Sequence, residues 1–188
     1  MKKVFLSVVI LFASLASFAQ KWSVDPAHSK IGFTVTHLML SEVDGNFKKF
    51  DASITSSKED FTDAVFSLSI DASTINTDNE MRDKHLKSAE YFDVEKYPQI
   101  TFTSKSITKI DAKNYKVNGD LTMHGVTKPI LLNLVLNGVG KNMRTQKPLA
   151  GFKITGTVNR KDFNVGTAPN AMVSENIEIR AVGEFNKE

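Results

Sequence analysis

Residue types that occur in hydrolytic triads and metal sites lie close together near the N-terminus. Asp25, His28 and Ser29 are near neighbours, but no Gly-x-Ser-x-Gly turn accompanies them, so capping of the turn after Pro26 is the simpler interpretation. The four histidines, at positions 28, 37, 85 and 124, lack the i, i+2 or i, i+4 spacing of a metal-binding pair, and the chain has no cysteine. We therefore predict no catalytic residues, no metal site and no cofactor, and we expect the last histidine in a turn.

Arg82 and His85 are candidates for contact with the head group of a ligand. They lie on a short polar segment that we expect to form a helix, with Thr77 or Asp78 as its N-cap. At helical spacing the two side chains lie on neighbouring faces, and a guanidinium fork suits phosphate oxygens. The alternative is structural, with Arg82 and Asp83 fixing the helix onto the barrel.

His37 ends a row of apolar residues that alternates with polar ones. Ile31, Phe33 and Val35 precede it at two-residue spacing, so a strand would place all four side chains on one face. In an apolar interior, His37 could bind a phosphate, amide or quinone oxygen, or act as an acid or base. The alternative is a histidine that hydrogen-bonds to backbone or water.

Arg160 shares the parity of Phe152 and would also point inward. A buried guanidinium needs an anion nearby. Asp162 or Asp120 would supply one in a structural salt bridge, and a ligand phosphate is the alternative.

The elements that position these residues are mostly strands. Alternation of apolar and polar residues continues through eight stretches, with one apolar and aromatic face and one face rich in Lys, Thr, Asn, Ser and Glu. This pattern predicts an all-β fold, an extended eight-stranded antiparallel barrel with an apolar lumen and one short helix at a barrel end. The expected strands are residues 30–38, 43–54, 63–71, 99–110, 114–123, 127–139, 149–160 and 175–186.

Two irregularities are expected in this barrel. Phe47 and Phe50 have opposite parity within one predicted strand, and a bulge near Lys48 and Lys49 would place both on the same face. Residues 161–174 contain glycine, proline and asparagine and are expected to form a flap over a barrel mouth. The predicted lumen is lined by Phe33, Val35, His37, Phe66, Leu68, Phe102, Leu121, Leu132, Leu134, Phe152 and Ile179.

The N-terminus has the layout of a secretory signal peptide, residues 1–19, with cleavage expected after Ala19. Removing Lys2 and Lys3 lowers the formal net charge from +3 to +1, so the remaining chain is nearly neutral. A neutral chain with interspersed charges argues against a nucleic-acid partner. We expect a periplasmic or secreted protein that does not span the membrane. The sequence leaves a homodimer open.

Several short sequence motifs resemble those of the YceI-like family, and they occur along residues 20–188 in the same order as in that family. They are Trp22, Asp25 and His28-Ser29, Phe33 to His37, Gly45-Asn46-Phe47, Arg82 to Ser88, Tyr91-Phe92-Asp93, Tyr97 to Ser104, Gly119 to Pro129, Asn159 to Phe163 and Val165-Gly166. The resemblance implies a lipocalin-like barrel that binds a polyisoprenoid or another long-chain amphiphile, such as a quinone, fatty acid or fatty amide, in an apolar tunnel.

Three alternatives to such a carrier remain open. A transmembrane barrel would present apolar residues outward, whereas the outward rows contain Lys153, Asn159 and Arg180. An enzyme acting on a lipid-like or quinone substrate would use His37 as acid or base. A purely structural barrel would fill its lumen with its own side chains.

Overall fold

The computed structural model describes residues 19–188. The predicted signal peptide therefore lies outside the described residues, apart from Ala19. Within residues 19–188, no helix is long and apolar enough to cross a membrane.

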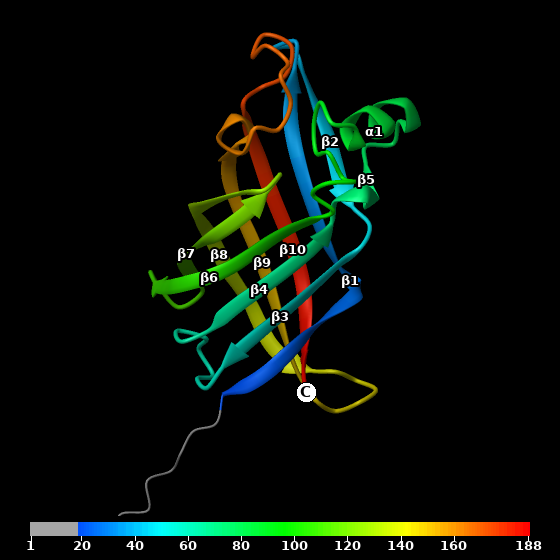
Figure 1. The fold of residues 1–188 in the computed structure, drawn as a ribbon. Coiled ribbons are helices and arrows are strands. Elements are labelled where there is room, and N and C mark those ends of the chain that lie inside the picture. Colours follow the sequence, from blue (N-terminus) through cyan, green and yellow to red (C-terminus); the bar gives the residue numbers. More distant parts are fainter. Residues whose placement is uncertain (1–18) are drawn as a thin grey trace, which may run out of the picture.

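The fold is a closed antiparallel β-barrel, elongated along one axis (Figure 1). Around the barrel the strands follow the order β1, β10, β9, β8, β7, β6, β4 and β3, and β3 pairs again with β1. Two short strands extend this ring, because β2 pairs with the second half of β1, and β5 pairs with β2. The bounds are β1 Gln20–His37, β2 Ser41–Phe47, β3 Phe50–Ser56, β4 Val65–Asp71, η1 Ala72–Thr74, β5 Ile75–Asn76, α1 Glu80–Lys87, β6 Gln99–Lys109, β7 Asn114–Met123, β8 Val126–Lys141, β9 Pro148–Asn159, η2 Arg160–Phe163 and β10 Asn176–Lys187.

The predicted all-β barrel with eight strands and one short α-helix at its end is confirmed. The first strand is longer than expected, because it begins at Gln20 and includes Trp22. The expected strand 43–54 is two strands, and the ladder is interrupted at Lys48 and Lys49 rather than merely bulged. The interruption has the expected effect, since Phe47 and Phe50 on its two sides both face the barrel interior.

Alternation places the apolar side chains inside the barrel as predicted. On β7, for example, Tyr115, Val117 and Leu121 are buried, while Lys116 and Asn118 between them are exposed. Glycine is needed where a large ring lies over a neighbouring strand. A Cβ on Gly45 would lie 2.2 Å from Cζ of Phe33, its direct cross-strand partner, so the Phe33 ring occupies the space of the missing side chain.

One end of the barrel, which we call the base, is closed by aromatic rings. Phe61, in the loop between β3 and β4, is 2% exposed. Its ring centroid lies 5.3 Å from that of Trp22 and 5.1 Å from that of Phe152, both edge to face. The lumen is therefore shorter than the strands, because the loop between β3 and β4 inserts the Phe61 side chain and closes this end.

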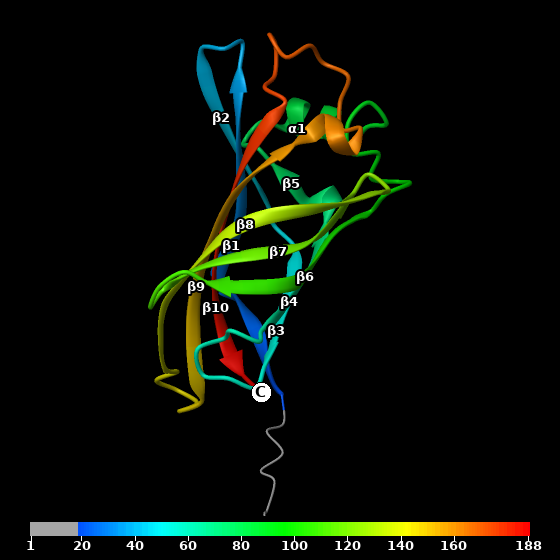
Figure 2. The same ribbon diagram turned by 90° about the vertical axis from the view of Figure 1, so that its left-hand side faces the viewer.

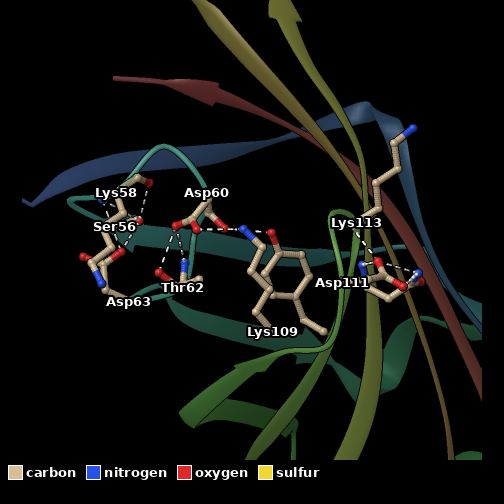
Figure 3. Close-up of polar contacts among 10 residues, drawn as sticks. Ser56, Lys58, Asp60, Thr62, Asp63, Lys109, Asp111 and Lys113 are labelled. Carbon is tan, nitrogen blue, oxygen red and sulfur yellow. Dashed lines mark hydrogen bonds and ion pairs between the residues drawn. The ribbon is translucent and has the colours of Figure 1, made fainter.

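Carboxylates hold this loop in place (Figure 3). Asp60 accepts hydrogen bonds from Lys109 Nζ and from the Thr62 hydroxyl, at 2.9 and 2.8 Å. These contacts lower the pKa of Asp60 to about 2. Burial alone would raise the pKa of Asp63, but the hydrogen bonds it accepts from Ser56, Ser57 and a backbone N–H outweigh burial, and its pKa is lowered.

The opposite end, which we call the mouth, carries the less regular segments. The β1–β2 hairpin, α1 and the loop after η2 all lie there (Figures 1 and 2). The N-cap of α1 is Asn79, whose side-chain oxygen accepts the N–H of Arg82 at 3.0 Å; the prediction of Thr77 or Asp78 was wrong. Thr77 is used differently, because its N–H and hydroxyl both donate to the Asp83 carboxylate.

Candidate ligand-binding cavity

The interior of the barrel contains a cavity of about 490 Å³. Volumes of roughly 300–1,000 Å³ are typical of pockets that bind small molecules. Its lining comes from strands on all sides of the barrel and from the segments at the mouth, and it is overwhelmingly apolar. The described lining includes no Asp or Glu. The cavity therefore suits an apolar guest with few polar groups.

Most of the residues predicted to line the lumen do so. The structure places ten of the eleven on the cavity wall: Phe33, Val35, His37, Phe66, Leu68, Phe102, Leu121, Leu132, Phe152 and Ile179. Leu134 is the exception. It has the correct inward parity, but it is 1% exposed and belongs to the packed core, outside the cavity lining. Parity selects the face of a strand and carries no information on the depth at which the cavity ends.

Several wall residues lie outside the predicted set. Tyr91 and Phe92 come from the segment after α1, and Met172 comes from the loop after η2. The Phe92 ring packs edge to face on Phe47, with centroids 6.1 Å apart. The Tyr91-Phe92-Asp93 motif could have indicated that Tyr91 and Phe92 line the cavity, because it places two adjacent aromatic residues within a polar stretch.

Arg160 organises the loop that forms part of the mouth, residues 164–174. Its side chain points inward as predicted and is 3% exposed. The expected carboxylate partners were wrong, because Asp162 pairs with Lys128 at 3.1 Å and Asp120 pairs with Lys105 at 2.6 Å. The five N–H groups of the guanidinium instead donate to backbone carbonyls of Val165, Gly166, Ala168, Val173 and Ser174, at 2.6–3.1 Å.

This arrangement leaves Arg160 without an N–H group for a ligand. A guanidinium has five N–H donors, and all are used by the loop. Burial of the charge is offset by the carbonyl dipoles around it. Tyr91 supports the same loop, since Gly166 has φ 72° and a Cβ there would lie 2.5 Å from the Tyr91 ring. The predicted flap is thus an ordered part of the cavity wall.

Arg82 and His85 both line the cavity from α1. Arg82 donates from Nε to the Thr77 hydroxyl and from one Nη to the Thr77 carbonyl, each at 2.7 Å. Because Asp83 accepts from the same threonine, the two residues fix the helix to the segment that precedes it. His85 contacts Glu90 through Nε2 at 2.5 Å and packs against the Tyr91 ring. The other Nη of Arg82 forms no hydrogen bond within residues 19–188.

His37 lies at the rim of the mouth. Its backbone pairs with Val173 in an isolated bridge, so the end of β1 is joined to the loop after η2. The imidazole lines the cavity and is exposed, and it has no hydrogen-bond partner in the described part of the chain. The ring is therefore free to contact a guest or solvent. A head-group role for His37, Arg82 and His85 remains a prediction.

Two of the triad-like residues near the N-terminus, Asp25 and His28, form a cluster with Glu184 outside the cavity, whereas Ser29 lines the cavity and accepts the N–H of Glu184. His28 Nδ1 lies 3.0 Å from Asp25 and 3.8 Å from Glu184. The hydrogen bond to Asp25 raises the pKa of His28, and the same bond lowers the pKa of Asp25. The three residues of the cluster offer ligand atoms within 4.8 Å of one another, and the hydrogen bond between His28 and Asp25 brings two of them together. Asp25 also accepts the N–H of Ala27, as turn capping predicted.

Fold and cavity together define a closed antiparallel β-barrel with an internal apolar cavity. The chain belongs to the family of the YceI-like domain, whose model matches residues 22–185. A UPF0312 protein of Staphylococcus aureus (strain N315) is 35% identical over 170 residues, covering 88% of this chain and 96% of the relative.

Solved structures share the fold. A YceI protein of Campylobacter jejuni is 33% identical, with a TM-score of 0.72, over 81% of this chain and 90% of that one. BcnA of Burkholderia cenocepacia has a TM-score of 0.78 at 24% identity, over 86% of this chain and 98% of its own. A polyisoprenoid-binding domain of Saccharophagus degradans has a TM-score of 0.62 at 15% identity, covering 89% and 98%. The last two likenesses concern the fold alone.

Proposed function

We propose that this protein is an exported, non-enzymatic carrier that holds one long-chain amphiphile, such as a polyisoprenoid, quinone, fatty acid or fatty amide, in its barrel. The observation that carries the proposal is the apolar cavity of about 490 Å³, which lies above the aromatic base and extends to the mouth. The Saccharophagus degradans domain, which has the same fold, is described as polyisoprenoid-binding. Export is supported by the charged, apolar and small-residue pattern of residues 1–19.

The affinity of such a carrier comes mainly from buried apolar area. Burial of ~500 Å² of hydrocarbon at ~25 cal/mol per Å² gives about 12 kcal/mol before the costs of association and ordering. The apolar chain would occupy the part of the cavity lined by Phe66, Leu68 and Phe102. The head group would lie at the mouth, where His37 and Arg82 have free polar atoms.

Organic extraction of the purified protein, followed by mass analysis, tests this function directly. We expect a long-chain molecule to copurify, and an empty extract together with no binding of added lipids would contradict the proposal. A cavity-filling variant sharpens the test. Ala181→Trp places an indole in the cavity, whereas Arg180→Trp, one residue earlier on β10, places it on the outer surface. Only the first should lower lipid affinity, by about tenfold or more.

A His37→Ala variant separates carriage from catalysis. The carrier should retain most of its lipid affinity, because the imidazole contributes one polar contact at the rim. Conversion of a bound lipid or quinone that disappears with the imidazole would instead favour the enzyme.

A further inference from the structure

The tip of the β1–β2 hairpin exposes three consecutive apolar side chains at the mouth. Leu38, Met39 and Leu40 are 48%, 76% and 86% exposed. The turn itself is well formed, because the Leu40 N–H donates to the His37 carbonyl at 3.0 Å. Runs of exposed apolar residues are costly for a protein in water and mark contact surfaces.

This tip is continuous with the cavity. The N–H of Leu38 donates to the carbonyl of Met172 at 2.9 Å, which joins the hairpin to the loop after η2. Met172 is itself 50% exposed and also lines the cavity, as do His37 and Val173 beside it. Apolar surface therefore runs from the cavity wall over the rim to the tip. The two segments lie side by side at the mouth in both views of the molecule (Figures 1 and 2).

The tip carries no cationic side chain. Residues 38–44 and 164–175 contain no Lys or Arg, and their ionised groups are Glu42, Asp44 and Glu175. Attraction to anionic lipids or polymers depends on clustered Lys and Arg, so the surface suits an uncharged apolar environment. A second copy of the chain is a poor occupant, because a stable interface buries about 800 Å² on each partner and a hairpin tip offers far less.

We propose that the Leu38–Met39–Leu40 tip inserts into the surface of a lipid bilayer, and that the mouth takes up or releases its cargo there. The proposal rests on the proposed function, because it is lipid cargo that gives the mouth a reason to meet a membrane. A chain leaving the bilayer would pass over the tip and Met172 into the cavity without crossing water. Insertion is driven by the transfer of apolar side chains out of water.

Cosedimentation with phosphatidylcholine vesicles tests the tip. The variant is Leu38→Asn/Met39→Asn/Leu40→Gln, chosen because Leu38 and Met39 have φ values of 51° and 58°, a region that asparagine tolerates well. The control is Met143→Gln, since Met143 is 90% exposed but lies in the β8–β9 connection at the base (Figure 1). All forms are produced by the same export route, so that processing of residues 1–19 is common to them.

We expect the tip variant to lose about tenfold or more in vesicle partitioning, and the control to bind as the parent does. Raising the salt concentration or adding phosphatidylglycerol should not strengthen binding. The proposal is overturned if the tip variant sediments with vesicles like the parent, or if the control loses as much. Tip-dependent dimers in sedimentation velocity, without vesicle binding, would assign the surface to a second copy instead.

A titration without vesicles keeps this proposal separate from the proposed function. A water-soluble fluorescent fatty acid should bind the parent and the tip variant equally, because the substituted side chains lie outside the cavity lining. Failure of the parent to bind any lipid probe would contradict the carrier function, whereas failure of vesicle binding alone would contradict only the tip.

Discussion

Replacing Phe61 with alanine tests whether the aromatic base holds the barrel closed. The side chain is 2% exposed and packs between Trp22 and Phe152. Removing a buried phenylalanine ring costs roughly 3–5 kcal/mol, including the void that it leaves. For a domain of this size each kcal/mol shifts the melting temperature by ~2–4 °C, so we expect Phe61→Ala to lower it by about 10 °C.

Thermal and urea unfolding measure this change, with Val65→Ala as the control. Val65 lies on the same hairpin but is 45% exposed, and its truncation should change the free energy of unfolding by no more than ~0.5 kcal/mol. Because Phe152 separates Phe61 from the cavity, loss of Phe61 also lets the Phe152 ring move toward the base, and the variant should prefer longer lipid chains. A loss of less than about 1 kcal/mol would refute the assignment of Phe61 as the closure.

Two further predictions concern the ends of the barrel. Folding lowers the pKa values of Asp60 and Asp63, so the two carboxylates stabilise the folded state fully above the unfolded pKa of ~3.9, and this contribution is lost as the pH falls toward 2. Melting curves from pH 6 to 2 should show the loss as a falling melting temperature. The melting temperature of Asp60→Asn should depend less strongly on pH. Arg160→Met removes all five hydrogen bonds to the loop, and we expect protease cleavage within residues 164–174 at least about tenfold faster than in the parent; unchanged cleavage would show that the loop is held by other contacts.

Alternation of residues was sufficient to predict the barrel and most of its lining, because strand parity and burial are linked by geometry. It placed Phe66, Phe102 and Leu132 on the cavity wall correctly. It could not place the end of the cavity, and Leu134 was assigned to the lumen for that reason. The closure depends on Phe61, which lies in a loop where no periodicity applies and φ is 56°.

The contacts of Arg160 were unpredictable for a different reason. The sequence predicted carboxylate partners, because a buried cation needs an anion or oriented dipoles nearby. The actual partners are backbone carbonyls. Every residue has one, so residue types give no information on which carbonyls will accept. The α1 N-cap had a similar ambiguity, because Thr77, Asp78 and Asn79 are adjacent and all are common N-caps. Only the structure shows that the N–H and hydroxyl of Thr77 donate to the Asp83 carboxylate instead of capping the helix.

The two ends of the barrel should respond differently to acid, because different groups hold them. The base loop depends on the carboxylates of Asp60 and Asp63, which accept hydrogen bonds in their ionised form and lose that role when protonated. The mouth loop depends on hydrogen bonds from the guanidinium of Arg160 to backbone carbonyl oxygens, and no carboxylate takes part in them. Acid therefore weakens the closure at Phe61 while the hydrogen bonds of residues 164–174 to Arg160 persist. Hydrogen exchange measured at pH 3 and pH 6 should show increased opening of residues 57–64, with the amides around Gly166 little changed.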